Sequence, residues 1–146
     1  MTPEDWELWN AWVHAQRLLT RELDRGLQRE CGITKTEFSV LVTLWRTPGH
    51  ELRVGDLVEA LGWEKSRVSH QLTRMEARDL IAPARSPSGR RTGISLTSQG
   101  RSIVQDALVV HGDNIRRHFL DSLTPSQTTA IRSWAEQTIE RIEPGR

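Results

Sequence analysis

Apolar side chains recur at helical spacing along most of the chain, and this pattern is interrupted only between residues 80 and 97. Near the N-terminus, a stripe that begins at Leu8 predicts a helix from residue 3 to about residue 29. Trp6 and Trp9 add a second apolar flank to this helix, more than one face of a small core would bury. We therefore expect the helix to pack against a partner subunit.

Threonine residues mark the starts of the predicted helices. Thr34, followed by Glu37, has the signature of a capping box, and the next helix has Phe38, Leu41, Val42 and Trp45 on one side. A short extended piece, ELRV at residues 51–54, is predicted next, and it leads into a short helix within residues 55–61. Further N-cap candidates for the first, the long and the last helix are Thr2, Thr97 and Thr124.

The stretch GWEKSRVSHQLTRMEARDL, residues 62–80, predicts a helix that follows the short helix after a glycine turn. Val68, Leu72 and Met75 fall at i, i+4 and i+7 and form one narrow buried stripe. The opposite face is polar and basic, whereas an ordinary surface helix more often shows Glu and Lys pairs at i, i+4. This contrast indicates that the polar face has a function.

Residues 80–97 predict a two-stranded ribbon with a flexible, basic tip. Short apolar pieces at 80–81 and 94–96 flank a segment rich in proline and glycine. Because Pro83 has no N–H to donate, its strand should lie at an edge or be bulged there. The predicted fold class is mostly α with a small β-wing.

A short helix, a tight turn and a second helix make a helix-turn-helix, whose second helix enters the major groove of DNA. The basic ribbon that follows is expected to form a wing that reaches the adjacent minor groove or its phosphates. The predicted DNA contacts of the recognition helix are Lys65, Ser66, Arg67, Ser69, His70, Thr73 and Arg74. Those of the wing are Arg85, Ser88, Arg90 and Arg91.

Charge is segregated along the chain, although the net charge is only +1. Residues 63–91 hold three acidic side chains and seven basic ones, which leaves an excess of four positive charges there and of three negative charges elsewhere. This distribution is typical of a surface that meets phosphates.

Composition narrows the class of protein further. The 146 residues, with 36% apolar and 27% charged side chains, are expected to form one globular domain. We expect no signal peptide, because the N-terminal stretch MTPEDWELWN is acidic and amphipathic rather than basic and then apolar. We also expect no membrane partner, because no run approaches the roughly 18 apolar residues of a membrane span, and hence a cytoplasmic protein. No catalytic or metal-binding motif is found, so we predict neither an enzyme nor a cofactor.

The stretch RVGDLVEALGWEKSRVSHQLTRMEARDLI, the wing SPSGRRTGISLTSQG and the flanking helices resemble the MarR family of bacterial transcription regulators. The resemblance implies a winged lobe at about residues 34–97, and dimerisation helices at about 3–30 and 98–143 that interleave between two subunits. It further implies a homodimer that binds a pseudo-palindromic, double-stranded operator, usually as a repressor released by a small aromatic or phenolic effector.

The family also implies an effector pocket between the winged lobe and the dimer helices. The residues that we expect to line it are Trp12, Trp45, His111 and Ile115. Packing in the core or at the dimer interface is an alternative role for each tryptophan, and for His111.

Two positions depart from the family pattern. Ser88 replaces the aspartate that usually precedes the wing arginine by two residues, and Asp79 stands where glycine is common.

Hydroperoxide sensors of the family carry a reactive cysteine near the start of the first helix, partnered by tyrosines. This chain has no tyrosine, and its single cysteine, Cys31, is expected past that helix. We interpret Cys31 as an inert thiol, with a redox sensor as the alternative.

A winged-helix module that binds other proteins is the competing interpretation. Salt dependence of duplex binding separates the two, because only a protein that neutralises several phosphates loses affinity steeply as salt rises.

Overall fold

The computed structural model describes residues 1–145, which form two compact units. The central unit is Thr20–His111, and the terminal unit joins Met1–Leu19 to the stretch that starts at Gly112. Both boundaries fall inside helices, namely α1 (Pro3–Cys31) and α5 (Ser98–His118). The structure is mostly helical with one small sheet, which confirms the predicted fold class. No helix within residues 1–145 is long and apolar enough to cross a membrane.

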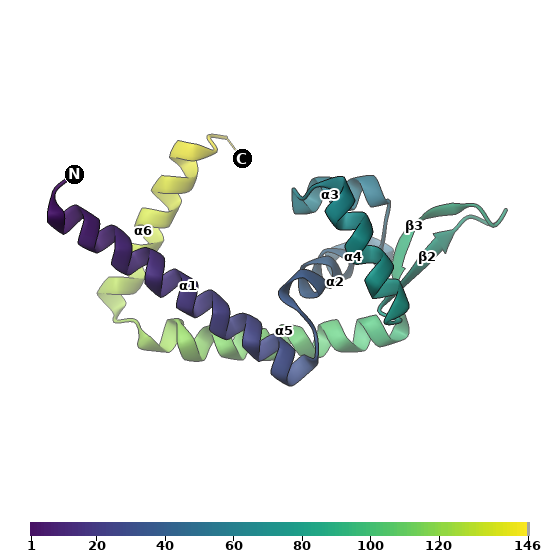
Figure 1. Cartoon of the computed structure of the whole chain (residues 1–146), viewed down its shortest axis with the longest axis horizontal. Helices are drawn as coiled ribbons and strands as arrows, with labels where there is room; N and C mark the ends of the chain where they lie inside the picture. The colour runs from purple at the N-terminus through teal and green to yellow at the C-terminus, as the bar shows by residue number, and fades with distance from the viewer. Residues whose placement is uncertain (146) are drawn as a thin grey trace. The chain divides into compact units, whose positions relative to one another are not determined.

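The helices α2 (Lys35–Arg46), α3 (Val54–Leu61) and α4 (Lys65–Ala77), labelled in Figure 1, all contribute side chains to the core of the central unit. The predicted stripe of α4 is confirmed, because Val68, Leu72 and Met75 are all buried. Our expectation of a single apolar side on α2 was too narrow. Val40 and Leu44 are buried as well, since α2 contacts both α3 and α4 together with the sheet.

The wing belongs to a three-stranded antiparallel sheet with the strand order β1-β3-β2, rather than to an isolated ribbon. The strands are β1 (Glu51–Leu52), β2 (Ile81–Arg85) and β3 (Arg91–Leu96). As predicted, Pro83 lies on an edge strand, and the register shifts between Ala84 and Arg85. Gly93 of β3 approaches the backbone of β1 closely, because an added Cβ there would lie 2.2 Å from the Leu52 carbonyl oxygen. A side chain at position 93 would therefore separate β1 from β3.

The predicted helix caps and the glycine turn are present. Capping boxes join Thr34 to Glu37 and Thr124 to Gln127, and the Thr97 hydroxyl accepts a hydrogen bond from the amide of Gly100. Gly62 ends α3 in the left-handed conformation, with φ 65°, which glycine adopts without steric cost. This single residue sets the turn from α3 into α4. A short 3₁₀ turn, η1 (Pro48–His50), precedes β1.

The terminal unit contains η2 (Leu120–Ser122), α6 (Pro125–Ile142) and the outer ends of α1 and α5. Trp12 contacts Trp9 and, edge to face at 5.8 Å between ring centroids, Trp134 of α6. Several large apolar side chains remain exposed in the single chain, among them Trp6, Leu8, Trp9, Trp134 and Ile139. The terminal unit thus presents apolar surface that one chain does not cover.

Cys31 is placed differently from our expectation. It is the last residue of α1 rather than a residue past that helix, because α1 continues two residues beyond the predicted end. Burial, with a further contribution from the carboxylates of Glu30 and Asp106, raises the pKa of the Cys31 thiol. A raised pKa reduces the fraction of reactive thiolate, and the surroundings of Cys31 therefore favour the inert thiol.

Candidate nucleic-acid interface

The outer face of α4 carries all the side chains predicted for the recognition helix. Each of Lys65, Ser66, Arg67, Ser69, His70, Thr73 and Arg74 is exposed. Their exposure follows from the burial of the opposite stripe, since helix geometry turns these positions away from Val68, Leu72 and Met75. The result is one polar and basic surface on a rigid helix, which is a suitable arrangement for reading base edges.

Two arginines on this helix are supported by neighbouring side chains. The guanidinium carbon of Arg67 lies 4.2 Å from the ring centroid of Trp63, a cation–π contact. Arg74 donates a hydrogen bond of 2.7 Å to the side-chain oxygen of Gln71, which is itself buried. Both arginines are thereby held near the helix surface while their remaining N–H donors stay available.

The wing tip is closed mainly by its own backbone. The amide of Gly89 donates to the Ser86 carbonyl, and the amide of Ser86 donates to the Arg90 carbonyl, both at 2.8 Å. Arg85 donates to the carbonyl of Gly89 at 3.0 Å, and the hydroxyls of Ser86 and Ser88 lie 2.8 Å apart. Within residues 1–145, the exposed side chain of Arg90 has no hydrogen bond or ion pair, which leaves its charge available to a ligand.

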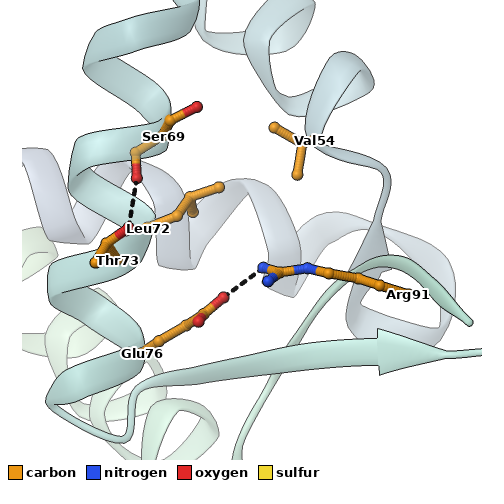
Figure 2. A pocket seen from close by; sticks show the side chains of 6 residues that line it. All are labelled: Val54, Ser69, Leu72, Thr73, Glu76 and Arg91. Carbon is orange, nitrogen blue, oxygen red and sulfur yellow. Dashed lines mark hydrogen bonds and ion pairs between the residues drawn. The ribbon is translucent and has the colours of Figure 1, made fainter. Parts of the chain in front are cut away.

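Two of the seven basic side chains counted in the sequence are already paired. Arg91 donates a hydrogen bond of 2.6 Å to Glu76 of α4, across a hollow of about 220 Å³ (Figure 2). Arg78 donates to both carboxylate oxygens of Glu37 at 2.5 Å. The basic groups that remain for phosphates or bases are Lys65, Arg67, Arg74, Arg85 and Arg90.

Sequence reasoning missed three side chains that shape this surface: Trp63, Gln71 and Glu76. The sequence spacing could have indicated two of them, because Trp63 is four residues from Arg67 and Gln71 is three residues from Arg74. Glu76 had no such signal, since its partner is 15 residues away on another element. Chain folding alone brings that pair together.

The four residues expected at an effector pocket are divided between the two units. Trp12 and Ile115 lie in the terminal unit, and Trp45 and His111 lie in the central unit. Trp45 stacks on His50 with 4.7 Å between ring centroids, whereas His111 packs against Phe38 at 4.9 Å. The effector pocket stays a prediction.

His111 is nevertheless an unusual group for an apolar stripe. Its ring atom Nδ1 is buried and has no hydrogen-bond partner within residues 1–145. Burial lowers the pKa of His111, the positive charge of Lys35 lowers it further, and the charge of Asp24 opposes the shift. The imidazole is therefore held neutral near pH 7, and its buried Nδ1 atom is left unpaired. No group of three or more His, Cys, Asp or Glu side chains in residues 1–145 is arranged to hold a metal ion.

A helix-turn-helix with a basic face, followed by a β-hairpin wing, defines the class of winged helix-turn-helix proteins. The model of the MarR family matches residues 32–92. AbsC, a MarR family transcriptional regulator from Streptomyces coelicolor, is 32% identical, and the alignment covers 97% of this chain and 96% of AbsC with a TM-score of 0.81. The chain therefore belongs to the MarR family of transcriptional regulators, which are not enzymes.

Two further solved structures are similar to the chain. Sco3205 is a MarR family transcriptional regulator from Streptomyces coelicolor that was solved in complex with DNA. It is 29% identical to this chain, and the alignment covers 99% of this chain and 91% of Sco3205 with a TM-score of 0.82. The Mycobacterium tuberculosis regulator MosR, also solved with DNA, is 22% identical, with coverages of 92% and 96% and a TM-score of 0.62, and it shows the fold alone. A search of curated proteins found no match.

Proposed function

We propose that the chain is a cytoplasmic homodimer that binds a pseudo-palindromic DNA operator in a sequence-specific manner. One observation carries the proposal: every side chain predicted to read DNA is exposed on one face of α4 or on the wing that follows it. The solved complex of Sco3205 with DNA supports this reading, because that regulator is 29% identical over nearly the whole chain.

In this proposal α4 enters the major groove, and His70 and Arg74 read base edges there. The wing, with Arg90 at its tip, reaches the neighbouring minor groove or its phosphates. A two-fold dimer would place two recognition helices about 34 Å apart, one helical turn of DNA, which is the reason to expect a pseudo-palindromic operator.

The dimer is supported by the apolar surface of the terminal unit. Trp6, Trp9 and Trp134 are each about half exposed in the single chain, and monomeric proteins rarely leave such clusters uncovered. Residues of about 3–30 and 98–143 would form the dimerisation region, and residues of about 34–97 the winged lobe. Sedimentation should give twice the 16.7 kDa mass of one chain.

Regulation by a small aromatic or phenolic effector completes the proposal, with release from DNA as the expected response of a repressor. The buried, unpaired Nδ1 of His111, on a ring that packs against Phe38, supports this part, since a phenolic hydroxyl that reached the nitrogen would supply its missing hydrogen bond. Trp12, Trp45 and Ile115 remain the other residues proposed to line the site. A panel of phenols tested for release of operator would check it.

The decisive experiment selects bound duplexes from a random pool and then measures the affinity of the best one against salt concentration. A recovered consensus with two related half-sites and a steep loss of affinity with salt are expected. His70→Ala and Arg74→Ala should change the preferred bases. Arg90→Ala should weaken all duplexes alike and lower the salt slope by about one, whereas the matched control Arg46→Ala should not.

A winged-helix module for protein partners is the competing function. It would bind every duplex weakly, without a consensus, and the selection experiment would then return random sequence.

A further inference from the structure

An ion pair joins the recognition helix to the outer half of the wing. Nη2 of Arg91, the first residue of β3, donates to Oε1 of Glu76, in the last turn of α4, at 2.6 Å. Figure 2 shows the two side chains extending toward each other from helix and strand. Val54 and Leu72 line the same hollow, together with the hydroxyl residues Ser69 and Thr73.

The inner half of the hairpin, residues 81–84 and 93–96, is held in place without this ion pair. Ile81, Ala84, Ile94 and Leu96 are buried and anchor the root of the wing in the core. The outer half, residues 85–92, contains only exposed or half-buried side chains, so apolar packing does not hold it. Within residues 1–145, no other side-chain hydrogen bond or ion pair joins α4 to this outer half.

The place of Glu76 has an electrostatic cost for a DNA-binding surface. A carboxylate beside the wing repels phosphates, and it also occupies an arginine that would otherwise attract them. A carboxylate at this point is consistent with a DNA-binding surface only if the ion pair strengthens DNA binding by more than the negative charge weakens it. What the pair can contribute is a fixed position of the outer wing relative to α4.

We propose that Glu76 and Arg91 are a positioning pair that sets the outer wing at the angle at which wing and recognition helix engage the same duplex. This inference rests on the proposed DNA binding. It gives Arg91 a role through Glu76, in place of the direct DNA contact expected from the sequence. Arg90 remains the wing side chain that meets the DNA.

The two possible roles of Arg91 predict opposite changes in DNA affinity for Glu76→Ala, and the test measures which change occurs. If the pair positions the wing, this variant should bind the selected operator about threefold to tenfold more weakly, although it has lost a negative charge, because a partly exposed charged hydrogen bond is worth about that much. If Arg91 is a phosphate contact restrained by Glu76, the same variant should bind all duplexes more tightly, with a salt slope steeper by about one. The second result would overturn the proposal.

A matched control separates charge from position. Glu64→Ala removes the same charge at the start of α4, from a side chain that has no hydrogen bond or ion pair within residues 1–145. This control should tighten duplex binding slightly or leave it unchanged. Equal weakening by Glu64→Ala and Glu76→Ala would also contradict a positioning role.

The reversed pair, Glu76→Arg with Arg91→Glu, keeps the net charge and restores an ion pair. It should recover binding to within about threefold of the wild type, whereas Arg91→Glu alone should bind poorly. A double variant that binds no better than Arg91→Glu would overturn the proposal, because a direct phosphate contact is not restored by reversal.

Hydrogen exchange on the free protein distinguishes failure of this inference from failure of the proposed function. Amides of residues 85–92 should exchange faster in Glu76→Ala than in the wild type or in Glu64→Ala. That result would hold even if no duplex were bound. Unchanged exchange together with intact operator binding would overturn the positioning pair and leave DNA binding standing.

Discussion

Arg78→Ala should lower the stability of the central unit by about 2 kcal/mol. Arg78 follows α4, and its Nη1 donates to both carboxylate oxygens of Glu37 at 2.5 Å. Its Nη2 donates to the carbonyl of Gly32 at 2.9 Å. The arginine thus ties the end of the recognition helix to the start of α2 and the loop before it.

The magnitude follows from the unequal exposure of the two side chains. The Glu37 side chain is 8% exposed and that of Arg78 is 46% exposed. Breaking a fully buried pair costs about 3–5 kcal/mol, and an exposed pair contributes about 1 kcal/mol or less. Without Arg78, the Glu37 carboxylate keeps only its long capping bond of 3.4 Å from the amide of Thr34. The expected loss therefore lies between the two limits.

Urea unfolding at a fixed protein concentration measures the effect, because the stability of a dimer depends on concentration. The midpoint should fall at an unchanged m-value. Arg46→Ala, at the exposed end of α2, should cost no more than a few tenths of a kcal/mol. A double-mutant cycle with Glu37→Gln should give a coupling energy of about 1–2 kcal/mol. A loss in Arg78→Ala no larger than in Arg46→Ala would refute the reasoning.

Three further predictions concern single residues. Asp79 has φ 57°, a conformation that favours glycine, so Asp79→Gly should raise stability by about 0.5–1 kcal/mol, and a loss in thermal unfolding would contradict the strain. Because the pKa of His111 is lowered below its usual 6.5, the folded state binds a proton less readily than the unfolded state, and stability should fall as the pH drops below about 6.5. His111→Gln should remove part of that fall, measured by unfolding at pH values between about 7.5 and 5.5, and identical pH profiles would refute the assignment. Because the pKa of Cys31 is raised, iodoacetamide should alkylate it more slowly than a free cysteine at pH 7, and a faster reaction would revive the redox sensor.

The helices and their caps could be predicted from the sequence because their signals are local. Thr34 with Glu37 and Thr124 with Gln127 are three residues apart, and the stripe of α4 spans two turns. The recognition face followed from the same stripe, since burial of one side of a helix fixes the direction of the other.

Contacts between distant elements could not be predicted in this way. Neither Arg78 nor Arg91 differs in sequence from the basic residues beside it, yet both are paired across the fold. The short extended piece ELRV was predicted, but its pairing with the wing as a third strand of the sheet was not. Only two residues, Glu51 and Leu52, pair with β3, too few to give an alternating pattern. Counting charges along the sequence therefore overstated the basic groups that remain free.

The tip of the wing has a consequence for how such a regulator diverges. Its turn is held by main-chain hydrogen bonds and by Arg85, so the side chain of Arg90 has no part in closing it. Selection for stability therefore acts weakly on position 90. A lineage can exchange this residue and so adjust its overall affinity for DNA without first having to repair its fold.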